Sequence, residues 1–197
     1  STMRNHCHFF VRSICFNRSM EVKDWLKQDA FSFEQFYGEA QKEEKNLLAA
    51  MSEKEKHDYL ISKVNYCQRK TSVSNLEQGV RIRKGDICFI DYGLSYVCEV
   101  AYQHFGLILS LVHGKAFVVP LGGNQKTLKR AKGKNNPQGK RHLMALGEVK
   151  GLSKSSVLFL NDAKWINTAR IIDVKAHLNP KEALFQEIRR RIIELIV

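Results

Sequence analysis

The stretch KGDICFIDYG (84–93) decides the fold class of the C-terminal part of this 197-residue chain. Its centre is apolar and β-branched, and it ends at a glycine that can form a turn. Four further runs of this kind follow at close intervals, with turn residues between them. They are FGLILS (105–110), KAFVVPL (115–121), HLMAL (142–146) and SVLFL (156–160). Short strands with closely spaced turns predict a small antiparallel barrel or sheet.

A helix is expected after these strands. The pair Asn179-Pro180 is typical of a helix start, with asparagine as the N-cap and proline at the first helical position. Apolar residues then recur at helical spacing and predict a face that packs against the sheet. They are Leu184, Ile188, Ile192 and Leu195.

Residues 20–72 predict two or three helices, with breaks near 29–31 and 51–52. Ser32 followed by Gln35, and Ser52 followed by Glu55, fit the capping box that begins many helices. The segment has no proline, and apolar residues recur in it at roughly helical spacing. We therefore expect an α+β protein: a helical N-terminal extension over residues 1–75, and a β-barrel domain with a C-terminal helix over 76–197.

The charge balance favours a polyanionic partner. Lysine and arginine number 32 against 20 acidic residues, which gives a net charge of +12. Segment 124–141 concentrates this excess and contains no acidic residue. Its glycines, asparagines and proline predict a long loop. Such a loop is either a solvated surface segment or an arm that grips phosphates, and we favour the arm because a polyanion relieves the repulsion between like charges.

Cysteine and hydropathy patterns bear on compartment and cofactors. The five cysteines form no CxxC pair and are odd in number, which predicts cytoplasmic thiols rather than a disulfide framework. His6, Cys7 and His8 lack a second ligand pair at zinc spacing, so we expect no metal site there. No apolar run is long enough for a membrane-spanning helix.

Several of these segments, in this order, resemble the MazF/PemK family of toxins. KGDICFIDYG (84–93), Glu99, HFGLILS (104–110) and FVVPLGGN (117–124) are similar to the first half of the family pattern. The second half is similar to HLMALGEVKGLSKSSVLFLNDAKWINTARI (142–171). The resemblance implies an SH3-like barrel, a homodimer, and cleavage of single-stranded RNA without a metal or other cofactor. It also implies a small antitoxin protein as partner.

The chain departs from the family pattern at positions that matter for chemistry. His104 stands where the family has the arginine of an Arg-Pro pair, and Gly122 stands where it has threonine or serine. His142 falls on a histidine that part of the family has, and Asp162 falls on the family's glutamine. Arg170 matches the arginine after the last strand. The arginine that would stabilise developing phosphate charge is thus missing from its usual place.

Metal-free RNA cleavage needs one group that takes the proton of the 2′-hydroxyl and another that protonates the leaving 5′-oxygen. Histidine, with an ordinary pKa of about 6.5, suits both roles. We therefore predict that His104 and His142 form an acid–base pair and that Asp162 orients one imidazole or raises its pKa. Basic side chains would bind the RNA phosphates. They are Lys126, Lys129, Arg130, Lys140, Arg141 and Arg170.

Two other interpretations stay open at this point. The barrel could bind nucleic acid without catalysis, since the family's arginine and threonine are both absent. It could instead be a protein-interaction module, with the helices of residues 20–72 as a docking or dimer surface. In a further arrangement, these helices cover the groove of the barrel and inhibit its activity.

Overall fold

The computed structural model describes residues 33–133 and 136–197. Its contacts divide the chain into two units, Ser1–Met51 and Ser52–Val197. In the first unit, helix α2 (Phe33–Ala50) has no buried residue, and the rings of Phe33 and Tyr37 stack with their centroids 5.8 Å apart. Ser32, Trp25, Lys134 and the segment around His6–His8 lie outside the described residues.

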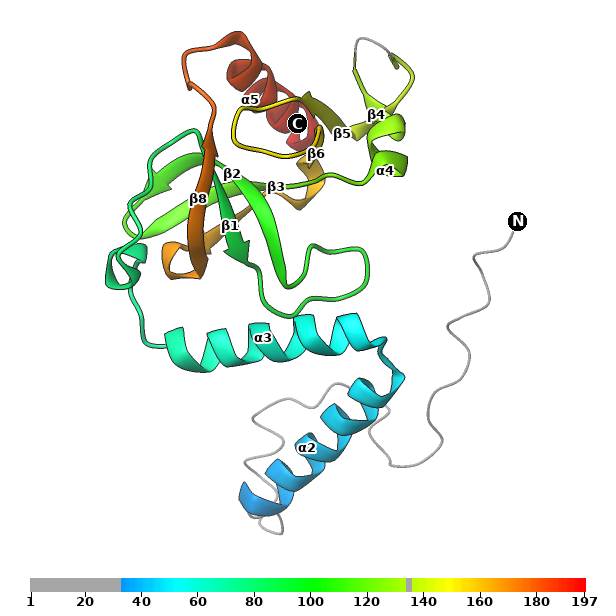
Figure 1. The fold of residues 1–197 in the computed structure, drawn as a ribbon, viewed down its shortest axis with the longest axis vertical. Helices are drawn as coiled ribbons and strands as arrows, with labels where there is room; N and C mark the ends of the chain where they lie inside the picture. Colours follow the sequence, from blue (N-terminus) through cyan, green and yellow to red (C-terminus); the bar gives the residue numbers. More distant parts are fainter. Residues whose placement is uncertain (1–32, 134–135) are drawn as a thin grey trace, which may run out of the picture. The chain divides into compact units, whose positions relative to one another are not determined.

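The second unit is built on one sheet of eight strands (Figure 1). The strand order is β4-β5-β6-β3-β2-β1-β8, and β7 pairs with β3. The strands are β1 (Asp86–Asp91), β2 (Gln103–Val112), β3 (Lys115–Gly122), β4 (Ala131–Lys132), β5 (Lys140–Gly147), β6 (Ser156–Phe159), β7 (Lys164–Asn167) and β8 (Ile171–His177). All strand pairs are antiparallel except β4 with β5. The predicted α+β class with an antiparallel sheet is therefore confirmed.

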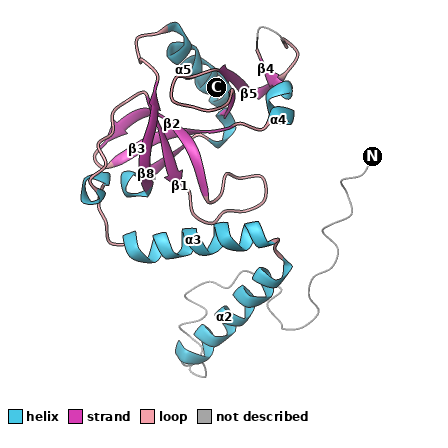
Figure 2. Ribbon diagram, in the orientation of Figure 1, coloured by secondary structure: helices cyan, strands magenta, loops and turns pink. Residues whose placement is uncertain are grey.

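The predicted barrel needs a correction, because the sheet is open. β4 and β8 are the two ends of the strand order, and no ladder joins them among the described residues. β4 is only two residues long, so it offers too few backbone groups to extend a ladder across the gap. Helix α5 (Ala183–Ile196), which Figure 2 draws in cyan, follows the last strand. Its buried residues belong to the core on this sheet.

The main core joins α5 to the sheet. Phe185, Ile188 and Ile192 are buried in a cluster with Leu107, Val119 and other strand residues. The predicted C-terminal helix and its Ile188–Ile192 face are confirmed. Its predicted start was wrong: α5 begins at Ala183 because the Asn179 side chain accepts the amide of Lys181 in a turn that precedes the helix.

Segment 124–141 is more ordered than the predicted loop. Asn124 caps a short helix, α4 (Gln125–Arg130), by accepting the amides of Lys126 and Thr127. The chain then continues into β4, and β5 begins at Lys140. The single long loop was therefore a wrong prediction, since the asparagine that indicated a loop starts a helix instead.

Helix α3 (Glu53–Arg69) belongs to the same unit as the sheet. Its N-cap is Ser52, and the predicted capping box with Glu55 is present. The Ser62 hydroxyl donates to Asp91 Oδ1 over 2.8 Å, and Asn65 Nδ2 donates to Asp91 Oδ2 over 2.6 Å. These contacts place α3 in the same unit as the sheet. The predicted domain boundary after residue 75 would instead place α3 in the N-terminal extension. Among the described residues, no helix is both long and apolar enough to span a membrane.

Candidate functional site

His104 lies on β2 with an exposed side chain. It pairs with Ile90 across the β1–β2 ladder. Its ring nitrogen Nδ1 is 2.7 Å from the carbonyl oxygen of Ala101. Because a carbonyl oxygen can only accept, Nδ1 carries the proton and Nε2 is the nitrogen that can exchange one.

His142, on β5, is half-buried and belongs to a group of ionisable side chains around Asp162. Asp162 ends the short helix η2 (Leu160–Asp162). Burial raises the pKa of Asp162. The nearby Lys164 lowers this pKa, Glu99 raises it, and the backbone amide of Val100 and the charge of His142 lower it, so that the net direction is upward. We call Glu99, His142, Asp162 and Lys164 the Asp162 cluster.

The Asp162 cluster contains the components of acid–base chemistry. A carboxyl whose pKa lies above its ordinary range is a stronger base than a free aspartate. An imidazole can donate or accept a proton near neutral pH, and a lysine supplies positive charge. The cluster brings together Asp162 and His142, two of the residues predicted from the sequence, and adds Glu99 and Lys164.

Strand register decides which face of the sheet each histidine occupies. Side chains opposite one another in neighbouring strands share a face, and successive residues alternate between faces. One row across β2, β3, β6 and β5 consists of Phe105, Leu121, Leu158 and Met144. His142 shares the face of Met144, two residues further along the strand, whereas His104 is adjacent to Phe105 and faces the other way. Alternation therefore assigns the two imidazoles to opposite faces, and a direct His104–His142 pair gains no support from it.

The predicted phosphate-binding residues fall into two groups. Lys126, Lys129 and Arg130 are exposed on α4, and Lys140 and Arg141 are exposed on β5. Arg170 is elsewhere: it ends the helix η3 (Thr168–Arg170), and its Nη1 donates to the carbonyl oxygens of Tyr92 over 2.9 Å and Asp91 over 3.3 Å. Arg170 therefore holds the chain at the end of β1.

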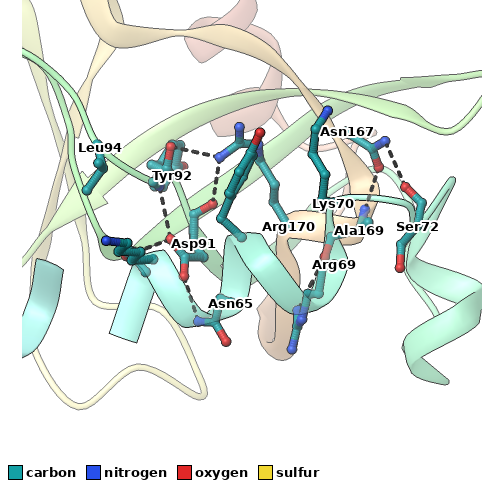
Figure 3. Close-up of a pocket in the computed structure, with 14 residues that line it drawn as sticks. Asn65, Arg69, Lys70, Ser72, Asp91, Tyr92, Leu94, Asn167, Ala169 and Arg170 are labelled. Carbon is teal, nitrogen blue, oxygen red and sulfur yellow. Dashed lines mark hydrogen bonds between the residues drawn. The ribbon is translucent and has the colours of Figure 1, made fainter. Parts of the chain in front are cut away.

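Two polar residues at this end of β1, Asp91 and Tyr92, were not predicted as site residues. Asp91 is buried and accepts from Ser62, Asn65 and the amide of Gly93 (Figure 3). Tyr92 is also buried, and burial raises the pKa of its phenol, with the charge of Asp162 among the further causes. Both residues lie within the quoted IDYG segment, but the strand signal there carried no information on their partners.

The described cysteines differ in exposure, because Cys88 is buried whereas Cys67 and Cys98 are exposed. Cys67, Cys88 and Cys98 are free, and burial raises the pKa of the Cys88 thiol to about 12. A thiol with such a pKa is not a nucleophile at neutral pH. No group of three or more His, Cys, Asp or Glu side chains among the described residues could hold a metal ion.

Comparison with known proteins gives no match to a family model and none to a curated protein. Solved structures of MazF toxins are similar to part of the chain. MazF from Deinococcus radiodurans has 15% identity and a TM-score of 0.45, with 58% of this chain and 96% of that chain covered. An endoribonuclease from a mycobacterial species, in complex with its cognate antitoxin, has 12% identity and a TM-score of 0.42. That similarity covers 59% of this chain and 95% of the mycobacterial one.

Proposed function

We propose that this chain is an endoribonuclease toxin that cuts single-stranded RNA without a metal ion. The observation that carries the proposal is the Asp162 cluster, in which a carboxyl of raised pKa lies within the electrostatic reach of His142 and Lys164. The order of the sequence motifs supports the same activity, and the net charge of +12 suits an RNA substrate.

The cluster suits transesterification within the substrate. The 2′-hydroxyl oxygen bonds to the neighbouring phosphorus, and the Asp162 carboxylate takes its proton. The bond from phosphorus to the 5′-oxygen breaks, and the protonated imidazole of His142 gives its proton to that oxygen. The products are a 2′,3′-cyclic phosphate and a free 5′-hydroxyl, and Lys164 offsets charge on the phosphate as the bonds exchange.

This assignment gives Asp162 the role that the sequence suggested for His104, because strand alternation favours it. His104 remains a candidate for the acid–base pair and is included in the test below. Lys126, Lys129, Arg130, Lys140 and Arg141 would bind the phosphates on either side of the cut, as sequence-independent contacts. Arg170 would contribute charge as well as holding the end of β1.

The proposal extends to the arrangement of the domain and to its partners. It includes an SH3-like course of the strands, a homodimer, a cytoplasmic location, and a small antitoxin that binds the chain. The alternative is a domain that binds nucleic acid or protein without catalysis, favoured by the absence of the family's arginine and threonine at His104 and Gly122.

Cleavage assays with single variants test the proposal. His142→Ala and Asp162→Asn should each slow the cleavage of a single-stranded RNA by about 10²–10⁴-fold, because each removes one proton-transfer group. Excess EDTA should leave the wild-type rate unchanged. DNA of the same sequence should stay intact, since it lacks the attacking hydroxyl.

Matched controls come from exposed residues of the same types. His57→Ala on α3 and Asp173→Asn on β8 should keep the wild-type rate. A loss in His104→Ala equal to that in His142→Ala would restore the two-histidine mechanism. Full activity of both His142→Ala and Asp162→Asn would remove the mechanism proposed here, and RNA binding by the wild type without scission would favour the alternative.

A further inference from the structure

A cavity of about 470 Å³ lies beside α3 (Figure 3). Its walls are the C-terminal half of α3, the chain that follows β1, and η3 with the residue before it. The volume is within the range of roughly 300–1,000 Å³ that is typical of small-ligand sites. Helix α3 lies outside the region of family resemblance, so this cavity, here called the α3 pocket, depends on an element that the resemblance does not cover.

The α3 pocket has a single carboxylate, and this group is already engaged. Asp91 is the only acidic residue among those that line the cavity. Its two oxygens accept hydrogen bonds from Ser62, Asn65 and the amide of Gly93. Asp91 is also 5% exposed. It therefore fixes α3 to the sheet and offers little negative charge to the open space.

The other charged residues that line the pocket are basic. Arg69 Nη1 donates to the carbonyl oxygen of Ala169 over 3.2 Å, and Arg170 likewise donates to carbonyl oxygens. Neither arginine has a carboxylate within ion-pair distance in the described part of the chain. Lys70 adds further charge, and Figure 3 shows Lys70 and Arg170 directed to the same side of α3. This arrangement suits a phosphate group.

An aromatic ring and amides make the pocket more specific than a basic patch. Tyr66 is 56% exposed, and Lys70 Nζ lies 5.8 Å from the centre of its ring. The amides of Asn65 and Asn167 and the hydroxyl of Ser72 also line the cavity. Aromatic rings beside cations bind the bases and phosphates of single-stranded nucleic acids, and amides can reach base edges.

We propose that the α3 pocket binds one nucleotide of a single-stranded RNA, with Tyr66 stacked on the base and Lys70, Arg69 and Arg170 around the phosphate. The chain after β1 connects this pocket to the Asp162 cluster: Gly93 and Leu94 line the pocket, and Glu99 and Val100 contact Asp162 electrostatically or through the backbone. An RNA strand bound along residues 93–100 would therefore reach both the α3 pocket and the Asp162 cluster. The choice of RNA rests on the proposed function.

Binding of an RNA that cannot be cut isolates the α3 pocket from catalysis. The probe is a fluorescein-labelled, mixed-sequence strand of about 12 nucleotides, all 2′-O-methylated, and the readout is fluorescence anisotropy in the full chain. Lys70→Gln should raise Kd by about 3–10-fold at low salt and lower the slope of log Kd against log salt by about 0.7, as for one lost phosphate contact. Tyr66→Leu should raise Kd by about fivefold or more without changing that slope.

Lys54→Gln is the matched control, because Lys54 lies near the start of the helix whose C-cap is Lys70, carries the same charge and bonds to Asp58 away from the pocket. It should leave Kd within about twofold of the wild type. Equal Kd values for Lys54→Gln, Lys70→Gln and Tyr66→Leu would overturn the proposal. So would tighter binding of an oligo-glutamate of equal charge, which would indicate an acidic protein segment, or displacement of the probe by micromolar uridine monophosphate, which would indicate a free nucleotide. Pocket-dependent binding by a wild type that cuts no RNA would refute the proposed function but not this inference.

Discussion

Helices α5 and α3 are attached to the same unit by different means. The buried residues of α5 are Phe185, Ile188 and Ile192, all apolar and all in the main core. Those of α3 are Tyr59 and Ser62, and the apolar side chains of Leu60, Ile61 and Val64 are 46 to 53% exposed. The specific bonds of α3 go to Asp91 and to the carbonyl oxygen of Ala169.

The difference separates a helix that stabilises the fold from a helix that shapes a site. Apolar burial is non-directional and roughly proportional to area, so α5 contributes to stability along its whole inner face. Hydrogen bonds to one buried carboxylate are directional and modest in net energy, so they fix the position of α3 more than they stabilise the fold. A polar attachment also leaves Tyr66 of α3 and the C-cap residue Lys70 exposed beside the cavity.

The largest loss of stability is expected on α5, which is attached to the sheet by buried apolar side chains. Ile188→Ala on α5 should lower the free energy of unfolding by about 3 kcal/mol, because Ile188 is fully buried and its removal leaves a cavity. Urea denaturation followed by circular dichroism measures this. Ile193→Ala on the same helix is the control, since Ile193 is 57% exposed and should cost at most about 0.5 kcal/mol. Equal losses in the two variants would contradict the assignment of the α5 inner face.

A smaller and local effect is expected at the attachment of α3. Asp91→Ala leaves the donors of Ser62, Asn65 and Gly93 without their acceptor, at a cost of about 1–3 kcal/mol. Amide hydrogen exchange should become faster over residues 53–69 and change little in β5 and β6. Asp173→Ala, on the exposed part of β8, should leave exchange in α3 unchanged. Faster exchange throughout the sheet after Asp91→Ala would mean that Asp91 supports the core and not the helix.

The sequence predicted the elements better than it predicted their partners. The capping box at Ser52, the strand at 84–93 and the Ile188–Ile192 face are local patterns, and local patterns are what periodicity and capping detect. β7 and β8 were not predicted as strands, because KWIN and IIDVKAH are interrupted by turn residues and charges. α4 was missed since six residues give no helical period to recognise.

The candidate site depends on relations that a single sequence does not contain. The face that a histidine occupies follows from register, and a shift of one residue reverses it. His104 and His142 could therefore be identified as chemically suitable, but not paired. The bonds of Ser62 and Asn65 to Asp91 join residues 29 and 26 positions apart. Nothing in the helical pattern of residues 53–69 indicates which strand end would receive that helix.

The smallest expected effect is a change in Tm on replacing Asp162. Its sign distinguishes a carboxylate that stabilises the fold from one that can act as a general base. The folded-state pKa of Asp162 lies above its ordinary value of 3.8, chiefly through burial, so the ionised form is disfavoured in the folded protein. The protonated Asp162 carboxyl therefore contributes to folding stability below pH 3.8. This contribution is lost as the pH rises through the folded-state pKa of Asp162. Asp162→Asn should therefore raise Tm by about 1–2 °C at neutral pH, opposite in sign to Asp91→Ala, with no gain below pH 3.8.

Asp173→Asn provides the matched comparison for this measurement. A hydrogen bond from Lys175 and one from the amide of Val174 lower the pKa of Asp173, so its contribution to stability is present at neutral pH and is lost as the pH falls. Its replacement should lower Tm slightly at neutral pH, where replacement of Asp162 raises it. A lower Tm for Asp162→Asn at neutral pH would mean that the fold needs this carboxylate ionised. Asp162 would then be a structural carboxylate like Asp91. Burial of an unfavourable charge could not be the reason that Asp162 is a stronger base than a free aspartate.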